Sequence, residues 1–518
     1  MSHNDIPAGT HVQGERYADV AETQSAVVFF AGDRAYKLKK PVSTGFLDFS
    51  TPEARAAACQ REVVLNRRFG RDVYLGVAEV RDPAGQVCDH LVVMRRMPAG
   101  RRLSALVQAG EPVCDVVRQV ARILAVRHAS APRSAAISEQ GSRDALWRRW
   151  QDNLKQIRPL LGGVLEASGV NEVERLAGRF LAGRAPLLSA RIRGGKVVDG
   201  HGDLLADDIF CLDDGPRILD CLEFDDRLRW LDGLDDAAFL AMDLERLGAG
   251  ELAGQFTRWY LEYSGDSAPP SLHHHYVAYR AFVRAKVACL RALQGDTLAG
   301  GEARQLAAMT LQHLRAGAVT LVLIGGLPGT GKSVLAGTLA SSLGFTVLSS
   351  DRIRKELAGL SPAEHSPAPY GTGIYTRSWT ERTYTELLHR AAELLSRGES
   401  VIADATWISA EQRAAARAVA DGTAADIVQL HCTAPSAVAA HRISSRSDSA
   451  SDADPAIAAR MAAAQAPWPD AVTLGPRDNG PCESGGCPPE LIQQALQAIH
   501  PATSESPWRP VRPYMLPD

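Results

Sequence analysis

The sequence predicts a two-domain protein, in which an α+β domain of two lobes precedes an α/β domain with a parallel sheet. The chain has 518 residues, roughly three times the ~150 residues typical of one domain. Short apolar runs alternate with turns over 25–98, and amphipathic helical patterns follow up to about 300. From residue 318 onward, apolar runs without polar alternation take turns with helical patterns, which is typical of a parallel sheet covered on both faces.

These patterns set the expected domain boundaries. The first domain is expected over 1–300, with a small lobe over about 1–98 and a helical lobe over about 99–300. The second domain is expected over 318–500. The Pro-rich tail over 501–518 is expected to be disordered.

The first domain is expected to begin with strand, strand, helix, strand, strand. The strands are predicted at SAVVFF, RAYKLKK, VYLGVAEV and VCDHLVVMRRM, and 52–69 is predicted as a helix that begins at a proline. In the helical lobe, Trp147, Trp150, Leu154 and Ile157 recur at helical spacing and are expected in the core. Two short strands, GKVVDG and PRILDCLEF, interrupt the helices.

The second domain is expected to alternate strands and helices. The strands are predicted at AVTLVLIGG, FTVLSS, ESVIADAT and ADIVQLHC, and the helix SVLAGTLASSLG follows the first of them. Residues 295–317 carry no strand signal and are expected to join the two domains. The stretch 475–489 is expected to be a loop.

Composition excludes several classes of protein. Hydrophobic residues make up 45% and charged residues 23%, which is ordinary for a globular protein, and the net charge of −3 gives no reason to expect nucleic-acid or membrane binding. The N-terminal residues lack the pattern of a signal peptide, and no apolar run approaches the ~20 residues that span a bilayer. Nine scattered cysteines do not resemble a disulfide framework, so we expect a cytoplasmic protein whose oligomeric state the sequence leaves open.

Residues 326–333 form a phosphate-binding loop motif between a strand and a helix. The sequence GLPGTGKS has the pattern G-x-x-x-x-G-K-S. The glycines let backbone N–H groups curl around phosphate oxygens at a helix N-terminus. The loop predicts binding of ATP with Mg²⁺, with Lys332 on the β/γ-phosphates and Ser333 on the metal. The residues expected to bind nucleotide here are Gly326, Gly329, Thr330, Gly331, Lys332 and Ser333.

Three further segments indicate which reaction takes place at this loop. Asp351 follows the second strand, where a carboxylate can orient or deprotonate an attacking hydroxyl. Asp404 ends the strand VIAD and is expected to hold the Mg²⁺ water shell. Arg442 and Arg446 recur at i and i+4 in HRISSR, which predicts a lid that clamps the transferring phosphoryl group, although such a pair also fits a solvated helix face.

Residues 319–500 resemble the P-loop kinases related to zeta toxin, gluconate kinase and polynucleotide kinase, which are grouped with AAA-type kinases. The segments that carry the resemblance are GLPGTGKS, SSDRIRK, VIADATW and HRISSR. The resemblance implies phosphorylation of a hydroxyl of a small molecule or nucleotide. The sequence shows no arginine-finger region, which disfavours a ring ATPase.

A second constellation lies in the first 300 residues. His201-Gly202-Asp203 is followed by Asp208 and Asp220, spacings of 5 and 17 that fit the base and the two metal ligands of a kinase-like lobe. Lys37 in AYK resembles the ATP-binding lysine of such a lobe. Glu62 in the following helix is its expected ion-pair partner, and Lys39 on the same strand face is the alternative lysine.

Residues 1–300 therefore resemble the aminoglycoside-phosphotransferase family, with a bilobal protein-kinase-like fold. The matching segments are AYKLKKPVSTGFLDFST, LNRRFGRDVYLG and HGDL…LDCLEFDD. The resemblance implies that Asp203 is the catalytic base and that Asp208 and Asp220 bind Mg²⁺. Asp208 departs from the asparagine usual in the family and adds negative charge beside the ATP phosphates.

Together the motifs predict a cytoplasmic ATP-dependent phosphotransferase with two nucleotide sites. Each site is expected to transfer the γ-phosphoryl group to a small-molecule hydroxyl, with neither nucleic acid nor membrane as partner. One alternative is a regulatory protein in which the N-terminal domain is a pseudokinase that gates the P-loop domain, and Asp208 keeps it open. A second alternative is a nucleotide-driven switch whose output is hydrolysis.

Overall fold

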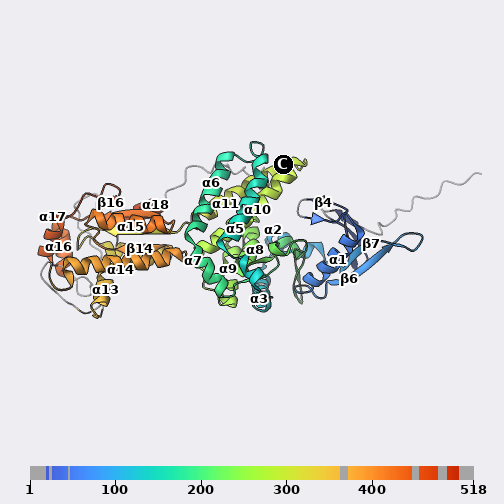
Figure 1. Cartoon of the computed structure of the whole chain (residues 1–518), viewed down its shortest axis with the longest axis horizontal. Helices are drawn as coiled ribbons and strands as arrows, with labels where there is room; N and C mark the ends of the chain where they lie inside the picture. The colour runs from blue at the N-terminus through green and yellow to red at the C-terminus, as the bar shows by residue number, and fades with distance from the viewer. Residues whose placement is uncertain are drawn as a thin grey trace, which may run out of the picture. The chain divides into compact units, whose positions relative to one another are not determined.

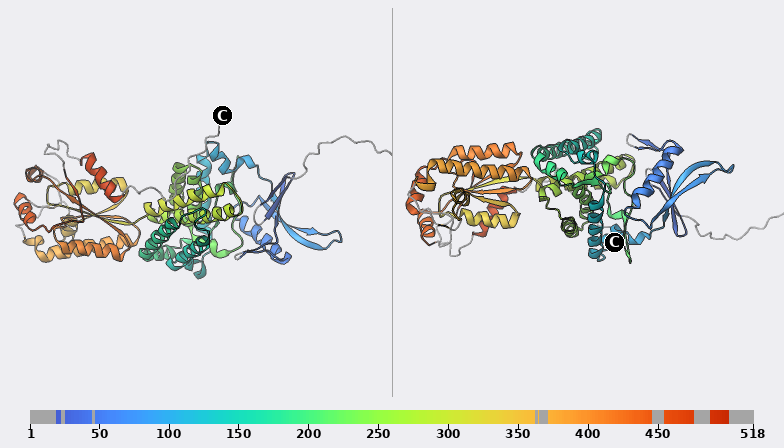
Figure 2. Two further views of the ribbon diagram at one scale, coloured as in Figure 1. Left: turned by 90° about the horizontal axis from the view of Figure 1, so that it is seen from above. Right: turned by 60° about the horizontal axis from the view of Figure 1, so that its bottom comes forward.

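The computed structural model describes residues 19–22, 26–44, 47–361, 364, 371–445, 454–475 and 487–500. Its residues divide into two compact units, drawn in Figures 1 and 2. Unit 1 takes Met1–Gln140 with Gly195–Asp266, and unit 2 takes Gly141–Gly194 with Ser267–Asp518. Each unit is described by itself.

Unit 1 begins with a five-stranded antiparallel sheet in the order β1-β2-β3-β7-β6. Its strands are β1 (Asp19–Glu22), β2 (Ala26–Ala31), β3 (Arg34–Lys39), β6 (Tyr74–Arg81) and β7 (Val87–Arg95). The predicted order of strand, strand, helix, strand, strand is confirmed, and β1 was not foreseen. A short hairpin, β4 (Ser43–Thr44) with β5 (Leu47–Asp48), precedes the helix.

Helix α1 (Pro52–Asn66) packs against β6 and β7. It begins where the side chain of Thr51 accepts a hydrogen bond from the amide of Ala54, with Pro52 in the first turn, and both features favour a helix start. Cys59 and Val63 lie in the core between this helix and the sheet. This packing fixes the orientation of α1 and therefore the position of Glu62.

The rest of unit 1 is mainly helical. Its helices are α2 (Leu103–Gln108), α3 (Cys114–Ser130), α4 (Ala135–Glu139), α8 (Gly233–Arg246) and α9 (Gly250–Ser264). Two antiparallel strand pairs lie among them: β8 (Val197–Asp199) with β11 (Trp230–Asp232), and β9 (Ile209–Leu212) with β10 (Gly215–Ile218). The 3₁₀ turns are η1 (Ala99–Arg101), η3 (Ala206–Asp208) and η4 (Asp226–Leu228). Because β10 ends at Ile218, Asp220 follows the strand; its expected place on the strand was wrong.

Unit 2 contains five long helices before its sheet. They are α5 (Arg143–Ile157), α6 (Ala167–Gly183), α7 (Ala185–Arg193), α10 (Pro270–Leu293) and α11 (Ala299–Ala316), with the turn η2 (Arg158–Leu160). Trp150 is 1% exposed, as expected of a core residue, and its indole Nε1 donates to Nε2 of His275 at 3.3 Å. The expected joining segment is mostly helix α11, which packs along α10.

The sheet of unit 2 is entirely parallel, in the order β13-β14-β12-β15-β16. Its strands are β12 (Thr320–Gly325), β13 (Thr346–Ser349), β14 (Val401–Asp404), β15 (Asp426–Cys432) and β16 (Val472–Leu474). Its helices are α12 (Lys332–Leu343), α13 (Ser350–Leu357), α14 (Arg377–Ser396), α15 (Ala410–Gly422), α16 (Ser436–Ser445), α17 (Pro455–Ala463) and α18 (Pro489–Ile499), with the turn η5 (Gly373–Tyr375). Every residue of β12 is buried, so the predicted parallel α/β domain is confirmed; β16 was not foreseen.

A buried arginine joins the long helices of unit 2 to the helices beside its sheet. Arg184, between α6 and α7, is 1% exposed. Its Nη1 donates to the carbonyls of Leu395 at 2.6 Å and Thr423 at 2.9 Å, which lie at the C-terminal ends of α14 and α15. Helix C-termini carry partial negative charge, so a cation is favoured there. The expected division at residues 300 and 318 stays a prediction, because the compact units group these helices with the parallel sheet.

Some predicted features lie beyond the described residues, namely Arg446, residues 476–486 of the loop expected over 475–489, and the tail over 501–518. Within the described ranges, no helix has the length and apolar character needed to cross a bilayer.

Candidate nucleotide sites

The loop between β12 and α12 has a backbone that only glycine accommodates well. Gly326, Gly329 and Gly331 all have positive φ values, of 135°, 81° and 95°. A β carbon at Gly326 would lie 2.2 Å from the carbonyl oxygen of Cys432, and one at Gly329 would lie 2.5 Å from that of Ala439. Both distances are closer than real β carbons approach an oxygen. The fold therefore requires the glycines that the phosphate-loop motif predicts.

The polar residues of the loop sit at the start of α12. Nζ of Lys332 and Oγ1 of Thr330 both donate to the carbonyl oxygen of Leu327, at 3.0 and 2.8 Å. Oγ of Ser333 donates to Oδ2 of Asp404 at 2.7 Å. The two residues expected to share a magnesium ion are thus in direct contact.

The sheet register brings the predicted residues to one edge. Asp404 pairs with Ile324 on one side and with Ser349 on the other. Ile324 precedes the phosphate loop and Ser349 precedes Asp351, so the three segments meet at the carboxyl ends of parallel strands, where α/β proteins bind ligands. Burial raises the pKa of Asp404, the charge of Lys332 opposes this, and the charge of Asp351 adds to it.

The P-loop edge fits Mg²⁺ in its donor chemistry. A hydroxyl and a carboxylate are oxygen donors of the kind Mg²⁺ takes, usually in company with water and substrate phosphates. The described ranges contain no group of three or more His, Cys, Asp or Glu arranged to hold a metal. The pair would therefore hold the ion together with a nucleotide.

Arg442 of α16 approaches the phosphate loop. Its Nη1 lies 3.5 Å from the carbonyl oxygen of Gly329, so the guanidinium is beside the loop as a lid residue would be. Arg446 lies outside the described residues. Its predicted role stays a prediction.

Two aromatic residues that the sequence did not single out support the loop. The amide of Trp407 donates to the hydroxyl of Tyr384 at 3.2 Å, and Trp407 has a positive φ of 51°, which is strained for a bulky residue. The carbonyl of Thr406 accepts a hydrogen bond from the amide of Gly326 at 3.2 Å. The segment after β14 thereby fixes the first glycine of the loop. Its only sequence signal is a polar-aromatic pair directly after a buried strand.

Unit 1 places the predicted lysine, glutamate and aspartate together. Nζ of Lys37 lies 2.7 Å from Oδ1 of Asp220 and 2.9 Å from Oε1 of Glu62, so the expected ion pair with Glu62 is present. Burial opposes the charge on Lys37, but the carboxylates of Asp220 and Glu62 outweigh it and raise its pKa. The charge of Lys37 in turn lowers the pKa of Asp220, which has a positive φ of 63°.

Asp203 and Asp208 belong to the same neighbourhood. Burial raises the pKa of Asp208 well above its usual range, and the charges of Asp220 and Asp203 raise it further. Carboxylate oxygens are donors of the kind that Mg²⁺ takes, so Asp208 and Asp220 fit this ion in donor chemistry, in company with the phosphates of a nucleotide. Their roles as ligands, and that of Asp203 as base, stay predictions.

A buried aspartate absent from the sequence-based list holds the loop that carries Asp203. Asp236 of α8 accepts hydrogen bonds from the amides of His201 at 2.7 Å and Gly202 at 2.8 Å. Its Oδ2 also lies 3.0 Å from Nε2 of His128. The pattern LDGLDD does not distinguish this residue from its neighbours, because only the fold brings α3 and α8 to the loop.

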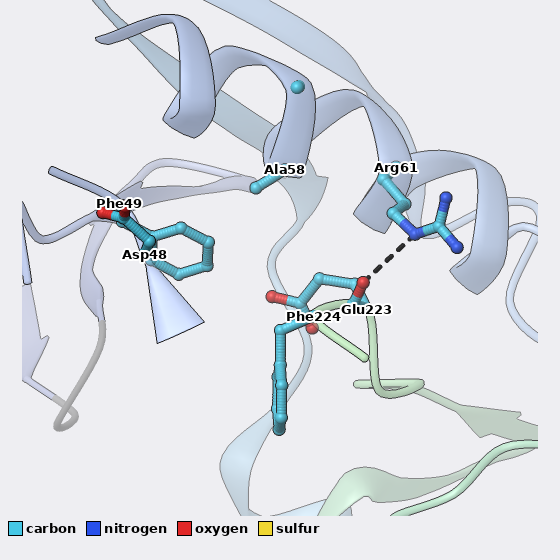
Figure 3. Close-up of a pocket in the computed structure, with 7 residues that line it drawn as sticks. Asp48, Phe49, Ala58, Arg61, Glu223 and Phe224 are labelled. Carbon is cyan, nitrogen blue, oxygen red and sulfur yellow. Dashed lines mark hydrogen bonds between the residues drawn. The ribbon is translucent and has the colours of Figure 1, made fainter. Parts of the chain in front are cut away.

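A pocket of about 320 Å³ lies beside α1 (Figure 3). It is lined by Asp48, Phe49, Ala57, Ala58, Arg61, Glu223 and Phe224. Nε of Arg61 donates to the carbonyl oxygen of Glu223 at 3.1 Å, the bond drawn in Figure 3. This pocket adjoins the segment that follows Asp220.

The folds and the P-loop edge define a class of protein in which an α+β unit with an antiparallel sheet precedes a parallel α/β domain that carries a phosphate loop. The family described as AAA domain matches residues 321–467, which confirms the predicted P-loop domain. An uncharacterized protein of Mycobacterium tuberculosis is 45% identical over 479 residues, covering 92% of this chain and 96% of that protein. The chain belongs to the same family as this mycobacterial protein.

Solved structures resemble the two parts separately. A choline/ethanolamine kinase family protein from Mesorhizobium loti is 15% identical, covers 59% of this chain and 94% of its own, and has a TM-score of 0.37. A gluconokinase from Sinorhizobium meliloti is 17% identical, covers 35% of this chain and 91% of its own, and has a TM-score of 0.25.

Proposed function

We propose that the protein is an ATP-dependent kinase with two nucleotide sites, each transferring a γ-phosphoryl group to a hydroxyl of a small molecule. The observation that carries the proposal is the P-loop edge of unit 2. There the glycine loop, Ser333 with Asp404, and Asp351 converge on adjacent parallel strands. ATP would lie on the loop, because its backbone N–H groups and the N-terminus of α12 favour phosphate.

A carboxylate beside the loop favours transfer over simple hydrolysis. Asp351 lies in the first turn of α13, close enough for its charge to act on Asp404. In the proposed reaction Asp351 accepts the proton of the acceptor hydroxyl, and Arg442 stabilises charge on the phosphoryl group. Mg²⁺ at Ser333 and Asp404 would neutralise charge on the ATP phosphates.

The first site is proposed to work by the same logic with different residues. Asp203 would accept the hydroxyl proton, Lys37 would contact the phosphates, and Asp208 and Asp220 would hold Mg²⁺. The regulatory alternative, in which unit 1 binds nucleotide without transferring phosphate, is favoured by one observation. Asp208 is a half-buried acid whose pKa is raised by the charges of two other acids, Asp220 and Asp203, where the resembling family has a neutral amide.

The test measures transfer of labelled γ-phosphate from ATP to a panel of sugars, nucleosides and aminocyclitols by the full chain. We expect Lys332→Ala to abolish one transfer activity and Asp203→Ala to abolish another, while Lys155→Ala on the exposed face of α5 changes neither. If Asp203→Ala changes nothing although unit 1 still binds nucleotide, the regulatory alternative replaces the proposal for the first site. If no hydroxyl compound accepts phosphate, the kinase proposal fails for both sites.

A further inference from the structure

Two lysines of β3 meet one buried carboxylate in unit 1. Lys37 and Lys39 are two residues apart on a strand, so their side chains leave the same face. Nζ of Lys39 donates to Oε2 of Glu62 at 2.7 Å. Oε1 of Glu62 lies 2.9 Å from Nζ of Lys37, yet it accepts no hydrogen bond from any residue that the structure describes. The hydrogen bond of Lys37 goes to Asp220 instead.

Lys39 also binds the segment that follows Asp220. Its Nζ donates to Oε1 of Glu223 at 2.6 Å and lies 4.9 Å from the ring centre of Phe49. The side chain of Lys39 is 2% exposed and that of Glu223 is 13% exposed. One ammonium group therefore ties together β3, α1 and the chain three residues beyond Asp220.

The two lysines are not equivalent. The side chain of Lys37 is 15% exposed and that of Lys39 is 2% exposed, so Lys37 is the one that a phosphate can reach. Burial opposes the charge on Lys39, but Glu62 and Glu223 outweigh it and raise its pKa. Both partners of Lys39 are carboxylates, and a buried carboxylate left without a cation is strongly disfavoured.

We propose that Lys39 is a positioning residue for the N-terminal nucleotide site. When Lys37 turns toward a phosphate, its contacts with Glu62 and Asp220 weaken; Lys39 keeps Glu62 paired and holds Glu223. The backbone on either side of Asp220 thereby stays in place. This inference rests on the proposed function, because it takes Lys37 to contact a nucleotide phosphate.

Figure 3 shows a second contact that holds the same segment, from Arg61 of α1 to Glu223 beside the pocket. Arg61 holds the backbone carbonyl of Glu223 at 3.1 Å, while Lys39 holds its side chain. Phe49 and Glu223 both line this pocket and both contact Lys39. Loss of the contact from Arg61 or of the contact from Lys39 should loosen the segment. Only loss of Lys39 also leaves Glu62 with a single cation, Lys37.

The experiment measures binding of ATP, ADP and adenosine by calorimetry to the full chain in a Lys332→Ala background, which silences the P-loop site. We expect Lys39→Met to weaken ATP and ADP binding about tenfold, a loss equivalent to about 1.4 kcal/mol, and to leave adenosine binding unchanged. A general loss of folding would weaken all three equally. Lys39→Arg should restore part of the affinity for ATP.

Matched variants assign the effect to the proposed contacts. Glu223→Gln should give a smaller loss than Lys39→Met, and the double variant should bind no worse than Lys39→Met alone, because both remove one coupled contact. Lys40→Met is the control, since Lys40 neighbours Lys39 in the chain and pairs with Glu22. It should bind all three ligands like the parent protein.

Three results separate the possible failures. If Lys39→Met binds ATP like the parent while Lys37→Met does not, Lys39 has no positioning role. If Lys39→Met loses ATP and Lys37→Met keeps it, Lys39 is itself the phosphate ligand and the proposal is overturned. If the Lys332→Ala parent binds no nucleotide, the proposed function of the first site fails instead. Should Lys39→Met not fold, the contrast between ATP and adenosine is decided by Glu223→Gln.

Discussion

The hydroxyl of Ser333 and the carboxylate of Asp404 are hydrogen-bonded at 2.7 Å, although 71 residues separate them in the chain. One belongs to the first turn of α12 and the other ends β14, the strand beside β12. Each is expected to help hold the same ion.

Asp404→Asn should weaken the response of the protein to Mg²⁺ by about 10- to 100-fold, the range found when residues that support a metal ligand are changed. The measurement is ATP binding and turnover as Mg²⁺ is titrated. Asp421→Asn, at an exposed position of α15, should leave the titration unchanged. An unaltered Mg²⁺ dependence in Asp404→Asn would remove Asp404 from the metal site.

Gly329→Ala should reduce ATP binding at the P-loop at least tenfold, about 1.4 kcal/mol. The new β carbon would lie 2.5 Å from the carbonyl oxygen of Ala439, and φ at this position is 81°. Gly337→Ala is the matched control, because its β carbon would meet nothing within 4 Å in the middle of α12. That control should stabilise the helix by roughly 0.5–1 kcal/mol without changing binding. Equal ATP affinity in both variants would contradict the strain argument.

Asp236→Asn should lower the free energy of unfolding by roughly 1–3 kcal/mol at neutral pH, because one of the two oxygens that accept from buried groups becomes an NH₂ donor. Burial acts to raise the pKa of Asp236, but His128 and the amide of His201 outweigh it and hold this pKa well below the usual range. The folded-state pKa lies below that of the unfolded chain, about 3.9, so the stabilisation is present above that pH and is lost as pH falls further.

Denaturant unfolding of the full chain at several pH values checks this prediction. Asp236→Asn should show a flatter loss of stability below pH about 4 than the parent protein. Asp213→Asn, whose side chain is fully exposed, should follow the parent at every pH. A parallel loss in Asp236→Asn and the parent would show that Asp236 is not the group responsible.

His275 should make unit 2 less stable in acid. Burial lowers the pKa of His275 to about 3, and its ring stacks on Phe180 with centroids 4.3 Å apart. An unfolded histidine has a pKa of about 6.5, so between pH about 6.5 and 3 the unfolded chain binds a proton that the folded chain does not. Stability contributed by the neutral ring therefore falls as pH falls through this window, by up to about 1.4 kcal/mol per pH unit.

His275→Phe should flatten this pH dependence, measured by denaturant unfolding between pH 7 and pH 4. The exposed His389 of α14 is the control, and His389→Phe should leave the slope unchanged. If the free energy of unfolding of His275→Phe still falls with pH as steeply as that of the parent, another buried group is responsible.

The sequence was sufficient for the parts of the fold that depend on local pattern. The phosphate loop and the parallel strands each follow from the pattern within one loop or strand. The pair of Lys37 with Glu62 was expected from the resemblance to a kinase-like lobe, and the structure contains it. Asp236 could not be identified in this way, because its three partners come from α3 and from the loop before β9. Trp407 was likewise missed, since neither its positive φ nor its contact with Tyr384 of α14 can be read from local spacing.

The second lysine shows the same limit. Lys39 lies two residues after Lys37, and side chains two residues apart on a strand share a face. This spacing left either lysine open as the partner of Glu62. The approach of Glu223, 184 residues away in the chain, to Lys39 and that of Asp220 to Lys37 separate the two lysines. The distinction depends on tertiary burial, which a spacing argument does not contain.

The buried guanidinium of Arg184 bears on whether the chain can be divided into two separate proteins. A β carbon at the neighbouring Gly183 would lie 2.0 Å from the carbonyl oxygen of Thr423, so the helices meet the P-loop part of unit 2 with no room for a side chain. A gene cut near residue 318 would yield two products that each expose a surface shaped for the other. Both surfaces stay buried only while the two parts of unit 2 remain on one polypeptide.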